Sequence, residues 1–370
     1  MKILFIQPYP TEGASARYRV EQYVPYLEKN GIKCVIRSFV STKFYKILYK
    51  KELYFKKILY FIQSSIQRFF DIFLAIRSDL IFIHLEAFPL GPPFLEYIFA
   101  KVLHKKIIYD LDDAIYIGST SSANNFLKYL KCPSKIKKII KISSHVIACN
   151  EYLANYAEKY NNNVTVIHTS VDTDKFKPIN REKKENIVIG WIGSHSTAKY
   201  LSELKDVFFE LSAKYKFTIK VIGAGEGCDF EILGVNVVQL DWSLKDEIAH
   251  FQSFDIGVYP LPEDEWTKGK TGFKTIQYMS IGIPCVVSDV GANRDIIKDG
   301  INGYLARTKE EWIEKISKLI DDAGLREKIG FAGRKTAEER YSLKINIPKF
   351  ISIFKSFSIA KNESKKYNYD

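Results

Sequence analysis

Short apolar runs rich in β-branched residues alternate along the chain with longer stretches of helical periodicity. The first half has six such runs, at residues 3–7, 34–39, 80–84, 106–111, 145–149 and 164–167. The second half has six more, at residues 187–192, 218–222, 235–240, 254–259, 285–288 and 303–305. Strand followed by helix, repeated, indicates parallel sheets covered on both faces. The pattern therefore predicts an α/β chain with two doubly wound, Rossmann-like domains.

The polar segment "KPINREKKEN" (177–186) separates the two series and is the predicted linker. We expect an N-terminal domain at 1–178 and a C-terminal domain at 186–342. The amphipathic segment 343–360 is expected to form a terminal helix that can pack back on the N-terminal domain, and 361–370 to be a polar tail. Ligands of parallel sheets bind beyond the carboxyl ends of the strands, so two facing sheets would hold a ligand in the cleft between them.

Residues 43–77 form a basic aromatic segment that reads as one long helix or two. Its cations alternate with Phe, Tyr, Ile and Leu, and they are Lys43, Lys46, Lys50, Lys51, Lys56, Lys57, Arg68 and Arg77. Such a helix suits the surface of an anionic bilayer. Alternatively, its apolar face packs on the sheet and the lysines are solvated. The number of bulky aromatics exceeds what one core-facing stripe needs, which favours membrane contact.

The charge of the chain is unevenly distributed. The net charge is +12, and residues 1–180 carry 26 Lys and Arg against 15 Asp and Glu, whereas the rest is almost balanced. This asymmetry indicates an anionic partner for the first half, either nucleic acid or an anionic membrane surface. Basic residues beside bulky aliphatics, without any RNA- or DNA-binding motif, favour the membrane over nucleic acid.

The five cysteines lie far apart and include no Cys-x-x-Cys pair, so neither a disulfide framework nor a zinc site is indicated. The N-terminus lacks the features of a signal peptide, and no run of about 18 apolar residues occurs. We expect a cytoplasmic protein that associates peripherally with the inner face of the membrane.

Polar residues follow two strands of the first half. After residues 3–7, a flexible turn leads into a helix with Arg17 and Arg19, which suits a phosphate or carboxylate, although a capped surface helix explains it equally. Asp110, Asp112 and Asp113 follow residues 106–111. These carboxylates can hold a divalent cation, orient acceptor hydroxyls or act as a base, and turn or capping roles can account for one of them.

Glycines follow two strands of the second half. Gly193 and Ser194 precede a helix expected to begin near Thr197, with Lys199 in its first turn, and together they suit a diphosphate. The glycines after the next strand, Gly223, Gly225 and Gly227, serve either a ligand or a tight turn. They are not a dinucleotide fingerprint, because residue 228 is cysteine.

Gly269-Lys270-Thr271 has the letters of a P-loop but not its context. The glycine that a P-loop needs five positions earlier is Asp264, and the loop is acidic. We therefore reject a P-loop. Lys270 and Lys274 instead precede an apolar helix that begins at Phe273.

The order of these motifs resembles glycosyltransferase family 4, retaining enzymes of the GT-B fold. The segment "GFKTIQYMSIGIPCVVSDVGANRDIIKDGINGYL" is similar to the Glu-x7-Glu region and glycine-rich turn of that family, and "WIGSHSTAKYL" to its phosphate segment. Ser194 stands where the family usually has arginine, and Gly269 and Gln277 stand at its two glutamates. We interpret these departures as traits of a subfamily with a W-x-x-G-K-x-G-F-K segment.

The resemblance implies two GT-B domains facing across a cleft, with a nucleotide-sugar donor on the C-terminal one. Lys199, Lys270 and Lys274 would neutralise the diphosphate, with Lys199 and Lys270 acting in catalysis, and Gln277 would bind ribose hydroxyls. The other donor-binding residues would be Gly193, Ser194, Gly223 and Phe273. The acceptor would meet Arg17, Arg19, Asp112 and Asp113, with Asp112 also catalytic. Transfer would retain configuration without a metal or other cofactor.

The leading function is a bacterial-type glycosyltransferase that extends a glycan or lipid-linked acceptor in cell-surface polysaccharide synthesis. A nucleotide-sugar epimerase of the same fold would need neither a lipid acceptor nor a basic aromatic helix. A nucleic-acid-binding protein would use the positive first half of the chain.

Overall fold

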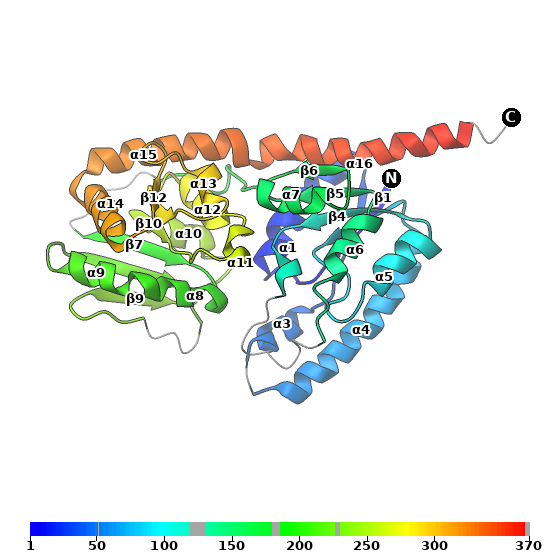
Figure 1. Ribbon diagram of the computed structural model, residues 1–370, viewed down its shortest axis with the longest axis horizontal. Helices are drawn as coiled ribbons and strands as arrows, with labels where there is room; N and C mark the ends of the chain where they lie inside the picture. The colour runs from blue at the N-terminus through cyan, green and yellow to red at the C-terminus, as the bar shows by residue number, and fades with distance from the viewer. Residues whose placement is uncertain (51, 119–129, 180–185, 226–229, 367–370) are drawn as a thin grey trace. The chain divides into compact units, whose positions relative to one another are not determined.

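The structure is a computed structural model that describes residues 1–50, 52–118, 130–179, 186–225 and 230–366. The chain forms two compact units, coloured along the chain in Figure 1. The first unit consists of residues 1–169 together with 346–370, and the second unit of residues 170–345.

The first unit is built on a six-stranded parallel sheet with the order β2-β1-β3-β4-β5-β6. Its strands are β1 (Lys2–Gln7), β2 (Lys33–Ser38), β3 (Leu80–His84), β4 (Lys106–Leu111), β5 (His145–Ala148) and β6 (Val164–Val166). The chain leaves β1 for β2 on one side and returns to β3 on the other. Strand order therefore reverses at β1 and β3, where ligands of such sheets usually bind.

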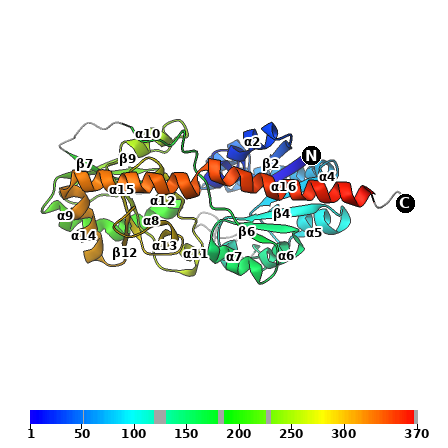
Figure 2. The ribbon, with the colours of Figure 1, turned by 90° about the horizontal axis from the view of Figure 1, so that it is seen from above.

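Helices cover both faces of the first sheet because each crossover between parallel strands must return over a face. They are α1 (Ala14–Arg19), η1 (Glu21–Tyr23), α2 (Val24–Lys29), α3 (Thr42–Leu48), α4 (Tyr54–Ile76), α5 (Phe94–Tyr97), η2 (Ile98–Val102), η3 (Ile115–Ile117), α6 (Lys135–Ile142) and α7 (Glu151–Glu158). Figure 2 shows α16 (Leu343–Lys366) lying along this sheet, where Phe354 contacts Phe5 of β1 and Phe82 of β3.

The second unit has a parallel sheet with the order β12-β11-β10-β7-β8-β9. Its strands are β7 (Ile187–Ile192), β8 (Phe217–Ile222), β9 (Asn236–Leu240), β10 (Ile256–Tyr259), β11 (Cys285–Ser288) and β12 (Tyr304–Ala306). Here the order reverses between β7 and β10. One large apolar cluster, which includes Trp191, Phe208 and Trp312, fills the space between the sheet and the helices on one face.

The helices of the second unit follow the same alternation. They are α8 (His195–Leu201), η5 (Ser202–Leu204), α9 (Lys205–Ser212), α10 (Glu247–Gln252), α11 (Glu265–Lys268), α12 (Phe273–Ser280), α13 (Asn293–Ile296), α14 (Lys309–Asp321), α15 (Ala323–Thr336) and η6 (Ala337–Tyr341).

All twelve predicted strands are present, with ends within two residues of the predicted ones. The α/β prediction of two doubly wound domains is confirmed. A fully buried parallel strand must be apolar along its whole length, as in β3, and therefore leaves a clear signal in the sequence.

The boundary between the units lies at residues 169 and 170, earlier than the predicted end of the first domain at 178. The segment after residue 170 packs on the second unit: Val171 pairs with Ser342, and the Phe176 ring contacts Phe251. Of the predicted linker 177–186, residues 180–185 lie outside the described part of the chain. The same is true of residues 367–370 in the predicted tail.

The basic aromatic segment forms two helices, α3 and α4, joined by residues 49–53. Of this segment, Lys51 lies outside the described residues. Within the described ranges, no helix combines the length and the apolar character needed to cross a membrane.

Candidate functional site

Two glycine turns meet at the carboxyl edge of the second sheet. A Cβ atom on Gly193 would lie 2.4 Å from Trp191 Cζ2, and one on Gly223 would lie 2.4 Å from the Gly193 carbonyl oxygen. Gly223 also has φ of 76°, a left-handed conformation that favours glycine. The turn after β8 therefore makes its close contact with the turn after β7. Gly227, the last glycine of the predicted series, lies outside the described residues.

Ser194 lies at the N-terminus of α8, which begins two residues before the predicted start at Thr197. The Ser194 amide donates a hydrogen bond to Thr197 Oγ1 at 3.3 Å. Lys199, further along α8, is exposed. Its ammonium lies 5.0 Å from the centroid of the Tyr200 ring, and its charge lowers the pKa of Glu203 against the larger effect of burial.

Lys274 extends from α12 to the place where strand order reverses between β7 and β10. Its Nζ atom donates a hydrogen bond to Thr197 Oγ1 at 3.2 Å. The same atom lies 4.9 Å from the ring centroid of Trp191 at the end of β7 and 4.8 Å from that of Tyr259 at the end of β10. The ammonium is therefore enclosed by two aromatic rings and the Gly193 turn.

This ammonium has no carboxylate partner within the described parts of the chain. Its contacts are the Thr197 hydroxyl and the two rings. Burial, followed by the charge of Lys270, lowers the pKa of Lys274 to about 7. Lys274 is half-buried, and an ammonium shielded from water in this way normally has an anionic partner, because the desolvation of an unpaired charge is costly. The arrangement is suited to receive an anion.

Lys270 lies close enough to Lys274 for its charge to lower the pKa of that lysine. The Lys270 ammonium lies 4.9 Å from the centroid of the Trp266 ring. Phe273 is partly exposed at the start of α12, whereas Gln277, on the same helical face as Lys274, is 5% exposed. The structure thus brings Lys270 and Lys274 together and places Lys199 beside Tyr200.

The loop that carries Lys270 is held by the segment after β11. Gly291 has φ of 53°, and a Cβ atom there would lie 2.8 Å from the carbonyl oxygen of Lys268. Thr275 of α12 donates a hydrogen bond to Asn293 Oδ1 at 2.8 Å. Asn293 in turn donates to the Ser288 carbonyl oxygen at 3.0 Å. These contacts fix both the loop and the start of α12, and with them the two lysines.

The side chains that enclose Lys274, namely Trp191, Tyr259 and Thr197, are not among the predicted site residues. Trp191 and Tyr259 belong to buried strands, where aromatic residues serve the core, so their types gave no functional signal. Their proximity to the ends of β7 and β10, the two strands at the reversal of strand order, is the feature that could have identified them.

The first unit has a buried ionic cluster at the carboxyl ends of β3 and β4. Arg19 donates to both carboxylate oxygens of Asp110, at 3.1 Å from Nε and at a shorter distance from Nη2. Arg19 Nη1 also donates to the Ile167 carbonyl oxygen at 2.8 Å. His84 Nδ1 contacts Asp110 Oδ2 at 2.7 Å. Burial alone would raise the pKa of Asp110, but Arg19 and His84 together lower it below its usual value.

The structure places Arg19, a predicted acceptor residue, inside the first unit rather than at its surface. The Arg19 side chain is fully buried, and its nitrogens bond to groups of the first unit. Asp110 is fully buried as well, so one of the three carboxylates is structural. His84, which sequence analysis missed, is also fully buried, and its Nε2 atom has no hydrogen-bond partner within the described residues.

Asp112 is the carboxylate beside this cluster. It is 6% exposed, accepts a hydrogen bond from Thr169 Oγ1 at 3.1 Å, and lies 3.8 Å from Arg19 Nε. Burial raises the pKa of Asp112 to about 6 although the charges of Arg19 and His84 lower it. The side chain is therefore ionised at neutral pH and is a stronger base than an exposed aspartate.

The remaining predicted acceptor residues are Arg17 and Asp113. Arg17 is 9% exposed, and its Nη1 atom donates to the carbonyl oxygens of Thr11 at 2.9 Å and Glu12 at 3.1 Å, which shapes the turn after β1. Asp113 is partly exposed, and its charge raises the pKa of Asp112. In the part of the chain that the structure describes, no group of three or more His, Cys, Asp or Glu side chains is arranged to hold a metal ion.

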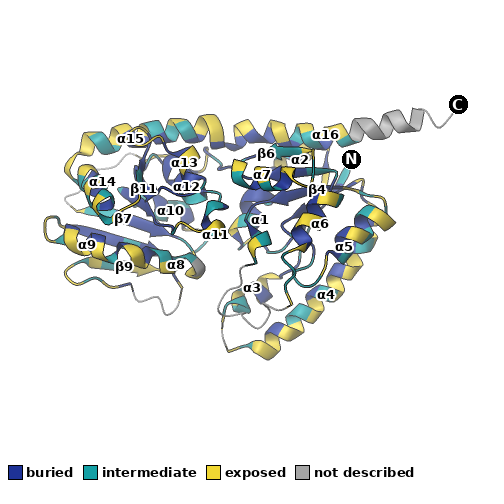
Figure 3. Ribbon diagram, viewed as in Figure 1, coloured by how far each residue is buried: buried dark blue, intermediate teal, exposed yellow. Residues whose placement is uncertain are grey.

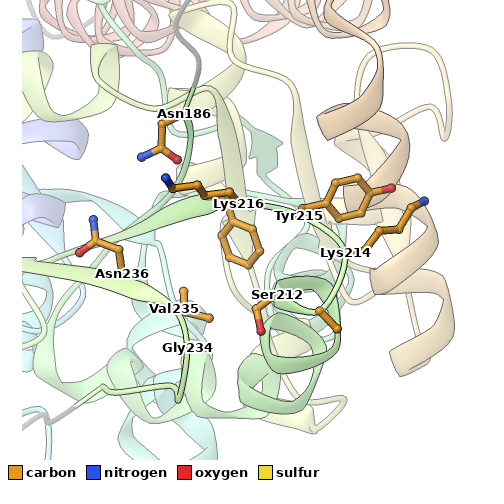
Figure 4. Close-up of a pocket in the computed structure, with 10 residues that line it drawn as sticks. Asn186, Ser212, Lys214, Tyr215, Lys216, Gly234, Val235 and Asn236 are labelled. Carbon is orange, nitrogen blue, oxygen red and sulfur yellow. The ribbon is translucent and has the colours of Figure 1, made fainter.

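A hollow of about 500 Å³ lies at the opposite end of the second sheet (Figure 4). It is lined by residues at the amino ends of β7, β8 and β9, among them Asn186, Lys216 and Asn236. None of the predicted site residues lines it. Because parallel sheets bind ligands at their carboxyl ends, the Lys274 region is the candidate site rather than this hollow.

Comparison with known proteins finds a family model that matches part of the second unit. Residues 186–322 match the family model described as "Glycosyl transferases group 1". That segment is therefore similar to glycosyl transferases group 1. It contains both lysines, the glycine turns and the rings that enclose Lys274. The matched segment makes up most of the second unit.

The whole chain is similar to solved structures in fold. A glycosyltransferase from Rickettsia africae ESF-5 has a TM-score of 0.69 at 16% identity and covers 96% of this chain and 98% of its own. Anabaena Alr3699/HepE in complex with UDP-glucose has a TM-score of 0.67 at 16% identity, with 96% and 99% covered. These matches show that the two units have the α/β two-domain architecture of GT-B proteins.

The capsular polysaccharide biosynthesis glycosyltransferase CapM of Staphylococcus aureus is 26% identical over 251 residues. The match covers 60% of this chain and 64% of CapM, so it spans less than two thirds of that relative's length.

Proposed function

We propose that this chain is a retaining glycosyltransferase that moves a sugar from a nucleoside-diphosphate-sugar to a glycan or lipid-linked acceptor in cell-surface polysaccharide synthesis. The family of residues 186–322, the name of CapM and the UDP-glucose bound to HepE support this class of reaction. The retaining stereochemistry and the absence of a metal requirement rest on the family resemblance alone.

The ammonium of Lys274, which has no carboxylate partner within the described residues, is the observation that carries the proposal. It lies where strand order reverses between β7 and β10, with Lys270 close by. Lys270 and Lys274 place two ammonium groups side by side, and Lys274 has no carboxylate partner within the described residues. Such a pair suits a ligand group with two negative charges. The diphosphate of a nucleotide-sugar is such a group, and it would act as the missing counter-ion.

The same lysines would promote the reaction. As the bond between the anomeric carbon and the diphosphate oxygen breaks, negative charge develops on the leaving diphosphate. Fixed positive charges at that place stabilise the transition state more than the ground state, which lowers the barrier. Lys274 is fixed by its two rings and Thr197, so little reorganisation is needed. Gln277, on the same helical face, would contact the ribose.

The first unit would supply the acceptor side. Asp112 is ionised at neutral pH and has a raised pKa, which suits a group that orients or deprotonates an acceptor hydroxyl. Arg19 and Asp110 would position it, because they form the buried ion pair beside it. Arg17 and Asp113 would border the acceptor.

Binding of UDP to a Lys274→Met variant tests the donor site. Losing a charge-assisted interaction of about 1.5–3 kcal/mol should weaken binding by roughly 10- to 100-fold in calorimetry. Lys268→Met is the matched control, because Lys268 lies in the same region but pairs with Glu265 at 2.6 Å. Its affinity should equal that of the unmodified protein.

Equal affinity in both variants would overturn the assignment of the diphosphate to Lys274. Incubation with a UDP-sugar and no acceptor separates transfer from epimerisation. Accumulation of an epimerised nucleotide-sugar would exclude the proposed reaction and support the epimerase alternative.

A further inference from the structure

Helix α4 buries polar side chains and exposes apolar ones, which is the reverse of what is expected for a surface helix. The side chains that it buries include Lys57, Ser64, Arg68 and Asp71. Its exposed side carries ten large apolar residues, each about half exposed or more: Tyr54, Phe55, Ile58, Leu59, Ile62, Ile66, Phe69, Phe70, Phe73 and Ile76. Surface helices normally bury the apolar face and expose the polar one. Figure 3 shows how much of α4 is exposed.

The buried ionic contacts hold α4 in this rotation. Arg68 Nη1 lies 2.8 Å from Asp71 Oδ2, and Arg37 Nε of β2 lies 2.6 Å from Asp71 Oδ1. Arg68 Nη2 also donates to the carbonyl oxygen of Gln7 at the end of β1, at 3.2 Å. Turning the helix to bury its apolar face would break these contacts. The exposed apolar face is therefore a fixed property of the first unit.

The apolar face is too large to be an ordinary surface feature. Aromatic and large aliphatic side chains that are half exposed contribute about 100 Å² each, so ten of them present on the order of 1,000 Å². The largest apolar patch on a typical soluble monomer is about 300–600 Å². Apart from Lys56, no exposed residue within α4 carries a charge. A partner that covers this face must be apolar over most of its area.

Positive charge borders the same face. Lys43 and Lys46 are exposed on α3, Lys50 just after it and Lys56 at the start of α4, and Arg77 is exposed just beyond the end of α4. The only exposed acidic residue among the described residues from 42 to 77 is Glu52. An apolar centre with a cationic border matches the interface of an anionic bilayer, where acyl chains lie beneath negative headgroups.

We propose that α4 lies in the plane of an anionic lipid bilayer, with its apolar face among the acyl chains and the lysines at the headgroups. The helix is about 35 Å long, which allows all of its apolar residues to reach the bilayer when it lies flat. A second copy of the chain is disfavoured as the partner, because a symmetric contact through this face would bring the cationic borders together. The inference does not depend on the proposed reaction.

Lys57 is not part of the cationic border, contrary to expectation from the sequence. It is 5% exposed, and its ammonium lies 5.5 Å from the centroid of the Tyr54 ring. Burial lowers the pKa of Lys57. Replacement of Lys57 would disturb the packing of α4 and would not report on lipid binding alone.

Flotation of the full chain with vesicles tests the proposal. The chain should float with vesicles of phosphatidylcholine and phosphatidylglycerol, and less with phosphatidylcholine alone. Replacing Phe70 and Phe73, each 61% exposed, by glutamate should reduce the bound fraction at least about tenfold. Phe331→Glu is the matched control, because Phe331 is 73% exposed on a helix of the second unit, and it should float like the unmodified chain.

A second variant tests the cationic border separately. Replacing Lys43, Lys46, Lys50 and Lys56 by glutamine should lower binding to the anionic vesicles and remove most of its salt dependence. Circular dichroism should show an unchanged thermal transition in both sets of variants, because the replaced side chains are exposed.

Two results would overturn the proposal. One is unchanged flotation of the Phe70→Glu, Phe73→Glu variant. The other is a dimer in sedimentation analysis that dissociates in this variant while neither protein floats, which would show that a second copy covers α4.

Discussion

At the scale of single residues, Lys274 combines a polar side chain with surroundings typical of a core. Trp191, Tyr259 and the Gly193 turn remove water from its ammonium, and Lys270 adds repulsion. Both effects disfavour the charged form in the free protein. A dianionic ligand would reverse this balance, so binding and protonation should be coupled.

The affinity for UDP should therefore fall as pH rises above about 7. The pKa of Lys274 is lowered to about 7 in the free protein, and the diphosphate should raise it in the complex. Above pH 7, binding must then take up a proton, and affinity should fall by up to about tenfold per pH unit until the pKa of the complex is passed. Calorimetry in buffers of different ionisation enthalpy measures this uptake.

Lys274→Arg is the matched control, because arginine stays protonated throughout this range. Its proton uptake should be absent even where its affinity is weaker. Equal uptake in the two proteins would place the titrating group elsewhere.

Asp112 should limit the transfer rate at low pH. Burial raises its pKa to about 6, so the ionised form is lost as pH falls through about 6. If Asp112 acts on the acceptor hydroxyl, kcat should fall below that pH, and Asp112→Asn should remove this limb and lower kcat by about 100-fold or more. UDP affinity should hardly change. If kcat of the Asp112→Asn variant still falls at low pH as it does in the unmodified protein, Asp112 is not the group that acts in catalysis.

At the scale of elements, α4 shows where periodicity misleads. Its apolar residues recur at helical spacing, which correctly predicts a helix, and the same pattern normally identifies the face that packs on the core. Here Arg68 and Asp71 occupy that face, because Arg37 and the Gln7 carbonyl oxygen supply partners for them. Which face a helix buries depends on contacts that are distant in sequence.

The lysines of α8 and α12 also differ in ways that depend on contacts distant in sequence. The order of glycines and lysines in the sequence correctly predicts polar turns at the strand ends. It does not distinguish Lys199, which lies over Tyr200, from Lys274, which reaches Thr197 and the ends of β7 and β10. Both lysines are near helix starts, and only the packing of α12 against the sheet separates them.

At the scale of the whole molecule, the end of the chain belongs to the first unit. Residues 346–370 group with residues 1–169, and Phe350 and Phe354 pack against Tyr23, Phe5 and Phe82. The stability of the first unit should thus depend on a segment that follows the second unit in sequence.

Phe354→Ala should destabilise the first unit alone. Phe354 is fully buried, and loss of such a side chain typically costs about 3–5 kcal/mol. The four tryptophans, Trp191, Trp242, Trp266 and Trp312, all belong to the second unit. In a urea titration of this variant, far-UV circular dichroism should show a transition at lower urea than in the unmodified chain. The transition followed by tryptophan fluorescence should keep its midpoint.

The exposed Phe331 provides the control, since Phe331→Ala should leave both signals unchanged. An equal shift of the fluorescence transition in Phe354→Ala would show that the two units unfold together.

The local structure of this protein follows from patterns in its amino-acid sequence. Each buried parallel strand needs a continuous apolar run, and each turn at a strand end needs glycine or polar residues, so the twelve strands and the turns that carry Lys270 and Asp112 are visible in it. Three features follow from tertiary contacts alone: Arg19 lies buried with Asp110, Lys274 lies between Trp191 and Tyr259, and α4 presents its apolar face outward. The reason is that burial and pairing of a side chain depend on residues from other strands and helices, which local spacing does not specify.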